Sequence, residues 1–336
     1  MMLTTMALAM LLAQGATPRA GTPQTDETVP VQRGGRLLIN NFAGDVIVHT
    51  WDKDSVHVTA RHQAHTRVTI HPTASGLSIS ASGTMGPQGS VDYDITAPAW
   101  MPVRVEGTYN FVTVDGAQGE VFATTVRGDV SVKGGSGVIT AKSVEGEVHV
   151  EGARGKVNVS SVNEKITIAD TSGDINAESI NGAVTMTGID AKSVDVSTVN
   201  GNIVFEGKLA DGGHYSFGTH NGDLSLGVPE NVNATFSIRT YQGSFSTDLP
   251  LPGVSRADLQ RGRRVTTALG NGSADVTLET FGGAIRLRRG TAVRPHARQT
   301  AEPTPAAAAF PAAAASARSA HAGPGISRPL AGHPET

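Results

Sequence analysis

The feature that most constrains the fold of this chain is a short segment that recurs along most of its length. Aligned on one position, the later copies are TVRGDVSV, SVEGEVHV, SVNEKITI, SINGAVTM, TVNGNIVF, THNGDLSL, TYQGSFST and TFGGAIRL, and an earlier copy is NFAGDVIV. The fourth position of one copy is Glu164. In the others it is glycine: Gly44, Gly128, Gly146, Gly182, Gly201, Gly222, Gly243 and Gly283. From Gly128 onward the copies are 18 to 21 residues apart, except for a last step of 40.

Each copy carries the alternation of apolar and polar residues that is typical of a β-strand with one buried face. Two and four residues after the aligned position, the later copies are apolar with the single exception of Thr247. A second apolar pair begins seven residues before that position, as in Val121 and Ala123. A unit of this length cannot bury its own apolar face, but units stacked in register share a core. The repeat therefore predicts an all-β, single-stranded β-solenoid, or β-helix, which we expect to be right-handed.

In such a stack, each position of the repeat becomes a column. We expect the glycines at corners where the backbone has a positive φ or bends sharply. The residues before the aligned position predict an amide ladder of Asn163, Asn181, Asn200 and Asn221. A Ser or Thr three residues before the aligned position predicts a hydroxyl ladder, with a binding stripe of the same residues as the alternative. His220 interrupts an otherwise apolar column of Val126, Val144, Val162, Ile180, Val199, Tyr241 and Phe281.

The sequence outside these repeats suggests four further segments. Residues 1–16 contain a short apolar run followed by small residues, which is typical of a secretory signal peptide, and residues 17–34 have the composition of a linker. Residues 35–105 contain longer alternating strands, from which we expect an antiparallel β cap on the solenoid. The solenoid repeats then occupy residues 106–290, and the Ala- and Pro-rich residues 291–336 are expected to be a disordered tail.

Composition excludes several functional classes. There is no leucine between Leu77 and Leu209, which is incompatible with a helix-rich enzyme core. The absence of cysteine excludes disulfides, thiolate metal sites and cysteine nucleophiles. A net charge of -3 with only 4% aromatic residues makes nucleic acid a poor partner. The apolar run of the signal is too short to span a membrane, and no later apolar run approaches the required length. We therefore expect no transmembrane segment in the mature chain.

The candidate metal ligands lie in the N-terminal part of the chain. Five histidines and two carboxylate pairs cluster there: His49, His57, His62, His65, His71, Asp52 with Asp54, and Asp92 with Asp94. The histidine spacing could suit zinc or nickel, but alternation with apolar residues favours a solvated strand face. The aspartate pairs lack the turn glycine and the distal glutamate of a calcium loop. We therefore expect no metal and no cofactor.

Asp129 and Glu147 are the candidate catalytic pair. They hold the same repeat position, so neighbouring rungs would place them about 5 Å apart, which is near the carboxylate separation of retaining glycosidases. Sugar sites usually add aromatic platforms, whereas the two tryptophans, Trp51 and Trp100, lie in the expected cap. A satisfied surface histidine is also the favoured interpretation of His220. We accordingly expect no catalytic residues.

Three parts of the sequence resemble one known family. The segments WDKDSVHVTA and PAWMPVRVEG, together with the recurring S/T-φ-x-G-x-φ-x-φ rungs, are similar to the toastrack-like adhesin family of β-strand repeats, domain of unknown function 4097. The resemblance covers roughly residues 35 to 290. It implies a single-stranded β-helix in an exported or membrane-facing protein, with roles in adhesion or envelope-stress sensing, and it implies no catalytic residues.

These observations favour a non-catalytic exported protein that is periplasmic, displayed on the cell surface or secreted. We expect it to act as an adhesin or envelope interaction scaffold whose partner is a cell-wall polymer or a protein. The alternatives are a carbohydrate-active β-helix enzyme, an envelope-stress sensing accessory protein and a self-associating stack of rungs. The sequence does not predict the oligomeric state.

Overall fold

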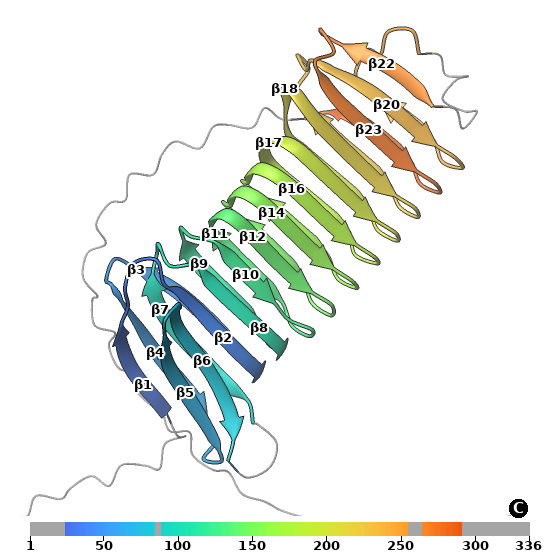
Figure 1. Cartoon of the computed structure of the whole chain (residues 1–336). Helices are drawn as coiled ribbons and strands as arrows, with labels where there is room; N and C mark the ends of the chain where they lie inside the picture. The colour runs from blue at the N-terminus through green and yellow to red at the C-terminus, as the bar shows by residue number, and fades with distance from the viewer. Residues whose placement is uncertain (1–23, 85–88, 255–263, 291–336) are drawn as a thin grey trace, which may run out of the picture. The chain divides into compact units, whose positions relative to one another are not determined.

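A computed structural model describes residues 24–84, 89–254 and 264–290. These residues belong to one compact unit, and they form 24 β-strands and no helix. The strands make one continuous, mostly parallel sheet with two faces (Figure 1). No described segment forms a helix able to cross a membrane. The all-β prediction is confirmed, whereas the right-handed sense of the coil stays a prediction.

The first face runs through the whole stack. In spatial order it consists of β5 (Thr66–Thr73), β6 (Gly76–Gly83), β2 (Arg36–Ala43), β8 (Val103–Tyr109), β10 (Val121–Thr124), β12 (Ser136–Ser143), β14 (Arg154–Ser161), β16 (Ser172–Ser179), the second halves of β17 (Val184–Thr198) and β18 (Ile203–Thr219), β23 (Ala274–Thr280), β20 (Ala234–Thr240) and β22 (Val265–Leu269).

The second face lies opposite the first across the core. In spatial order it consists of β1 (Gln24–Pro30), β4 (Ser55–His62), β7 (Val91–Pro98), β3 (Val46–Trp51), β9 (Val112–Ala117), β11 (Val130–Gly134), β13 (Val148–Glu151), β15 (Ile166–Ala169), the first halves of β17 and β18, β19 (Leu224–Val228), β24 (Ile285–Arg289) and β21 (Phe245–Thr247).

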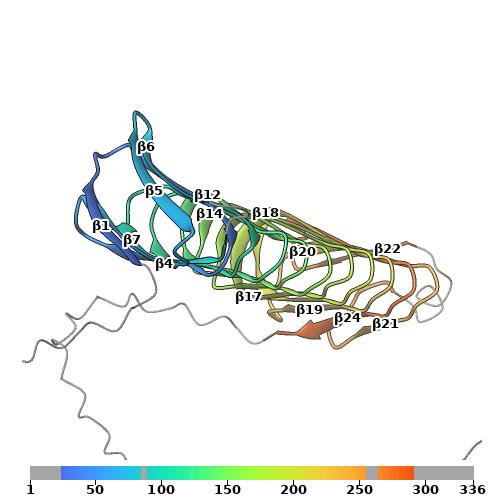
Figure 2. The same cartoon turned by 90° about the horizontal axis from the view of Figure 1, so that it is seen from below.

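The apolar pairs of the repeat form the core between the two faces. Val148, Ile166 and Val184 are direct neighbours in the parallel register of the second face, and all three are buried. Figure 2 shows the rungs as successive loops around this narrow interior. Each rung needs the apolar surface of its neighbours, because a single rung buries little by itself. The expected stack of two-strand units is therefore present.

At the N-terminal end, spatial order departs from chain order. β2 and β3 lie between the later strands β6 and β7 on one side and β8 and β9 on the other, and all four contacts are parallel. Antiparallel pairing at this end is limited to β1 with β4, β4 with β7, and β5 with β6. The prediction of an antiparallel cap over residues 35–105 is therefore wrong for β2 and β3, which form a rung turning at Gly44.

The predicted linker also needs correction. Gln24–Pro30, in its second half, form β1 and pair along their whole length with β4. The reason is that alternate side chains of this segment, Val29 included, can cover the edge of the second face, and Val29 is buried. The predicted signal peptide and tail lie outside the described residues.

The C-terminal end shows the same departure from chain order. The last rung, β23 and β24, lies between the rung of β18 and β19 and the rung of β20 and β21. β22 pairs antiparallel to β20 beyond it. The 40-residue step between the last two glycines therefore contains an inserted segment that carries β22 before the chain re-enters the stack at β23. The chain passes the end of the stack and returns one rung earlier, where parallel partners on both sides satisfy its backbone.

Candidate interaction surface

The aligned glycines lie in tight turns that connect the two faces along one edge of the stack (Figure 1). A Cβ added at Gly182 would lie 1.9 Å from the Glu164 carbonyl oxygen of the preceding rung. The same close approach occurs at Gly146, Gly201, Gly222, Gly243 and Gly283, at 1.7 to 2.1 Å. Only Gly44 and Gly128 of the aligned glycines also have positive φ, at 107° and 113°. A positive φ therefore explains the need for glycine at Gly44 and Gly128. At the other aligned glycines, close stacking on the backbone of the neighbouring turn explains it.

The four asparagines of the predicted ladder lie in one column beside these glycines. The Asn181 amide nitrogen donates to the Asn163 side-chain oxygen at 3.0 Å, and Asn200 donates to Asn181 at 3.1 Å. Asn221 continues the series by donating to Asn200 at 2.9 Å. All four are exposed, so their remaining amide groups face solvent. The column presents a regular row of donors and acceptors along the turn edge.

The Ser and Thr column forms a different network from the one expected. Its hydroxyls do not bond to one another but donate to the backbone of the neighbouring rung, as from Ser143 to the Gly128 carbonyl at 2.9 Å. Thr219 makes the same bond to Gly201 at 2.9 Å. The hydroxyl also accepts from its own turn, as from the Gly182 N–H to Ser179 at 2.9 Å. These side chains are buried, so they belong to the rung-to-rung framework and not to a binding stripe.

The residues between the hydroxyl and amide columns form an apolar row that we call the turn ridge. Backbone hydrogen bonds join successive turns, for example from Asn181 N–H to the Val162 carbonyl at 2.8 Å and from Asn200 N–H to the Ile180 carbonyl at 2.7 Å. In spatial order the turn ridge consists of Phe42, Thr108, Val126, Val144, Val162, Ile180, Val199, His220, Phe281 and Tyr241, while Tyr109 pairs with Arg127 in the neighbouring column and its ring lies against Phe42.

Aromatic rings stack at both ends of the turn ridge. The Phe42 and Tyr109 rings have centroids 5.4 Å apart, and the Tyr241 and Phe281 rings have centroids 5.5 Å apart. His220, which interrupts the column in sequence, stacks on Phe281 at 4.7 Å with the planes 9° apart. Its ring therefore extends the aromatic end of the ridge, which agrees with a surface role and not with a catalytic base.

The first face carries an outward row of small polar side chains that the sequence analysis missed. Thr140, Asn158, Asn176, Asp195 and Ser216 are successive register partners from β12 to β18. They point away from the core, because their neighbours in each strand are buried. We call these residues the polar row. The sequence contained a signal for this row, because each of its members lies between the two apolar residues of a pair that forms the core.

The two carboxylates considered as a candidate catalytic pair form contacts within the stack. The Asp129 carboxylate accepts the backbone N–H of Glu147 at 2.8 Å, and the Glu147 carboxylate pairs with Lys165 at 2.9 Å. Both acids thus serve contacts between rungs on the exposed turn edge.

The candidate metal ligands at the N-terminal end bind other partners and do not converge on one point. His57 lies beside Thr28 at 3.0 Å, His62 beside Thr25 at 3.0 Å, and Asp92 accepts the Asp45 N–H at 3.1 Å. Within residues 24–84, 89–254 and 264–290, no group of three or more histidine, aspartate or glutamate side chains is arranged to hold a metal ion. His49, His57, His62 and His71 lie on β-strands, and His65 lies in the turn between β4 and β5.

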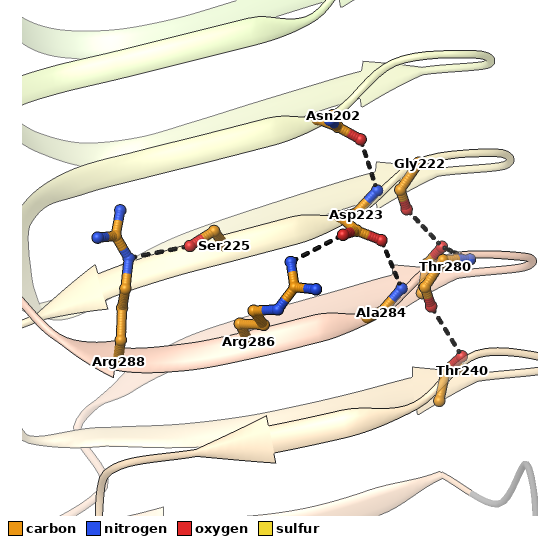
Figure 3. A network of polar contacts seen from close by, with 10 residues as sticks. Asn202, Gly222, Asp223, Ser225, Thr240, Thr280, Ala284, Arg286 and Arg288 are labelled. Carbon is orange, nitrogen blue, oxygen red and sulfur yellow. Dashed lines mark hydrogen bonds and ion pairs between the residues drawn. The ribbon is translucent and has the colours of Figure 1, made fainter.

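A polar network holds the returning last rung against the rung that precedes it in space (Figure 3). The Asp223 carboxylate accepts the Ala284 N–H at 2.9 Å and pairs with Arg286 at 2.7 Å. The Ala284 N–H and the Arg286 guanidinium together lower the pKa of Asp223 against a smaller opposing effect of burial. Arg288 donates to Ser225 at 2.9 Å on the same strand pair. These contacts join β19 to β24, so the network stabilises the position of the last rung.

A comparison with models of protein families shows which family this chain belongs to. A model described as Toastrack, domain of unknown function 4097, matches residues 39–288. The chain belongs to the Toastrack family. The matched residues include most of the inserted first rung and almost all of the returning last rung. The resemblance seen in the sequence is therefore confirmed.

Among solved structures, this Toastrack chain is similar to two bacterial proteins. One is a putative cell adhesion protein from Clostridium sporogenes, at 10% identity and a TM-score of 0.20, with 80% of this chain and 100% of that chain covered. The other is a putative adhesin from Bacteroides fragilis, at 11% identity and a TM-score of 0.37, with 81% and 100% covered. A search of curated proteins finds no match.

Proposed function

We propose that this Toastrack protein is an exported, non-catalytic, adhesin-like scaffold that binds a polymer of the cell envelope along the polar row. The observation that carries the proposal is the unbroken register of the row. Thr140, Asn158, Asn176, Asp195 and Ser216 follow one another through four successive parallel pairings. Neighbouring strands are about 4.8 Å apart, so the row presents hydroxyl and amide groups at a regular spacing.

The chemistry of the polar row suits a polymer with repeating polar groups. Four of its five side chains are uncharged, and amide and hydroxyl groups both donate and accept hydrogen bonds. A periodic surface engages several repeats of such a polymer at once, so individually weak contacts combine into useful avidity. The engagement of Asp129 and Glu147 within the rung framework supports binding without turnover. Export to the periplasm, cell surface or medium is part of the same proposal.

Co-sedimentation with isolated cell-envelope polymer tests this function. The full chain is compared with an Asn158→Ala, Asn176→Ala, Ser216→Ala variant, and the matched control is Thr113→Ala, Thr167→Ala, Thr185→Ala on the outward side of the second face. Three lost hydrogen bonds at about 0.5–1.5 kcal/mol each predict at least tenfold weaker binding for the first variant only. Equal binding by both variants, or release of soluble fragments from the polymer, contradicts the proposal. Fractionation of tagged cells tests the export.

A further inference from the structure

Asparagine comes directly before glycine at four places in the chain: Asn181, Asn200, Asn221 and Asn271. Glycine has no side chain to shield its backbone nitrogen, so an asparagine in this pair is open to intramolecular attack. The glycine nitrogen attacks the side-chain Cγ, and ammonia leaves to give a five-membered imide. Water then opens the imide to aspartate or isoaspartate. The structure holds the four asparagines differently, so their reactivity should differ.

Two of the four asparagines are held from both sides by the amide ladder. Asn181 donates to Asn163 at 3.0 Å and accepts from Asn200 at 3.1 Å. Asn200 in turn accepts from Asn221 at 2.9 Å. The side chain of either residue must turn to bring its Cγ onto the following glycine nitrogen, and this movement breaks two hydrogen bonds. Asn181 and Asn200 are therefore protected.

Asn271 is held in a different way, in the turn between β22 and β23. Its side-chain oxygen accepts the Ser273 N–H at 3.1 Å. The Gly272 N–H, which carries the attacking nitrogen, donates to the Leu269 carbonyl at 3.2 Å. Both reacting groups have partners within the turn, so Asn271 is protected as well.

Asn221 is held by the ladder from one side only. It donates to Asn200, but the next turn in space belongs to the returning last rung and has Gly282 at this position. A Cβ added at Gly282 would lie 3.3 Å from the Asn221 side-chain oxygen, so this oxygen faces a position without a side chain. Gln242, the equivalent residue of the rung that follows in the chain, lies one turn further on, where its N–H donates to the Phe281 carbonyl. The return of the last rung therefore ends the ladder at Asn221.

We propose that Asn221 is the site at which this chain deamidates, and that the amide ladder protects Asn181 and Asn200. The Asn221 side chain is exposed, so the water that opens the imide has access to it. The reaction replaces the donor of the last ladder bond by a carboxylate, whose oxygen would face the side-chain oxygen of Asn200. One neutral side chain of the turn edge thus becomes negatively charged.

Peptide mass mapping of the full chain, incubated in mildly alkaline buffer, tests the proposal. Each rate is divided by the rate of the same asparagine in the chain unfolded in urea, so that the effects of neighbouring residues cancel. One ladder bond fewer predicts protection at Asn221 that is about two- to tenfold weaker than at Asn181 or Asn200. A folded chain in which Asn221 is no less protected than the other three asparagines overturns the proposal.

Two reciprocal variants test the role of the ladder. Gly282→Asn supplies a further amide beside Asn221 and should slow its deamidation to the rate of Asn200. Asn163→Ala removes the acceptor of Asn181 and should speed deamidation at Asn181 while leaving Asn221 unchanged. If neither variant changes the rate at its neighbour, the ladder does not control the reaction and the proposal is wrong.

Discussion

The hydroxyl of Thr280 donates to the carbonyl oxygen of Gly222 at 3.1 Å, across 58 residues of intervening sequence. On the other side, the Thr240 hydroxyl reaches the carbonyl oxygen of Gly283 at 3.4 Å. The last rung is thus bonded to an earlier rung and to the rung it follows in the chain. These hydrogen bonds on both sides of the last rung stabilise the C-terminal end of the stack. A disulfide cannot do so, because the chain has no cysteine.

Replacing Thr280 by valine should loosen this end of the stack. Thr280 is fully buried, and its hydroxyl also accepts the Gly283 N–H at 3.1 Å. A valine side chain has a similar shape but would leave a buried carbonyl and a buried N–H unpaired, at a cost of about 1–3 kcal/mol. Urea unfolding should show this loss, and hydrogen exchange should rise in β23 and β24. Thr277→Val, outward on the same strand, is the control and should cost little.

Gly182→Ala should destabilise the fold through close backbone stacking. A Cβ at this position would lie 1.9 Å from the Glu164 carbonyl oxygen, so the two turns would have to separate. Overpacking of this kind costs about 1–3 kcal/mol or more. Gly218→Ala is the matched control, because a Cβ there meets no atom within 4 Å. Equal melting temperatures for the two variants would contradict the stacking explanation.

Tyr93→Phe should leave the stability unchanged or raise it. The Tyr93 hydroxyl is buried without a hydrogen-bond partner in the described structure, and burial strongly raises the pKa of the phenol. Removing an unsatisfied buried polar group relieves a desolvation penalty of about 1–3 kcal/mol. Chemical denaturation of the variant measures the effect, and a clear loss of stability would indicate a partner for this hydroxyl.

Tyr215→Phe should lower the stability, in contrast to Tyr93→Phe. The Tyr215 hydroxyl donates to the Ala191 carbonyl at 2.5 Å and accepts the Ala210 N–H at 2.7 Å, so it joins β17 and β18 where the register of this strand pair shifts. Its removal leaves both backbone groups without this partner, and we expect a loss of about 1–3 kcal/mol. The same denaturation series measures it, with Tyr93→Phe as the internal reference.

Asp223 should make the C-terminal end sensitive to acid. Its pKa is lowered in the folded protein, so the carboxylate stabilises the fold at pH values above the ordinary value of 3.8. This contribution is lost as the pH falls through the lowered pKa. The pair with Arg286 is exposed and screened by solvent, so we expect less than about 1 kcal/mol. In urea titrations, the stability gap between the wild type and Asp223→Asn should be present at pH 6 and shrink below pH 4.

Much of the rung architecture could be predicted because it is encoded locally. The alternation around Val148 and Val150 marks a strand with one buried face, and its recurrence marks a stack. The amide column could also be predicted, since Asn181 and Asn200 hold the same repeat position. In the later rungs the core also contains larger side chains, and Phe205 and Phe217 pack there with ring centroids 5.1 Å apart.

The candidate surfaces were less accessible to sequence reasoning. The column of Val144, Ile180 and Phe281 was visible as an apolar pattern, but only the structure shows these side chains outside the core. Asn110 was missed altogether. It is fully buried, and its amide donates to the Gly44 carbonyl at 2.7 Å, which ties the inserted first rung to the next. Val112 and Val114 follow Asn110 by two and four residues, which is the spacing of the aligned position, and this was the available signal.

The sequence by itself determined the two-strand rung, the inward residues and the turn columns, because each depends on spacing within a single repeat. The tertiary structure decided which rungs are neighbours and why the turns require glycine. β2 enters between the later strands β6 and β8, and β23 enters between the earlier strands β18 and β20, so spatial order differs from chain order at both ends. Parallel rungs of similar sequence can pair in more than one order, and burial and backbone hydrogen bonding across the whole stack select one of them.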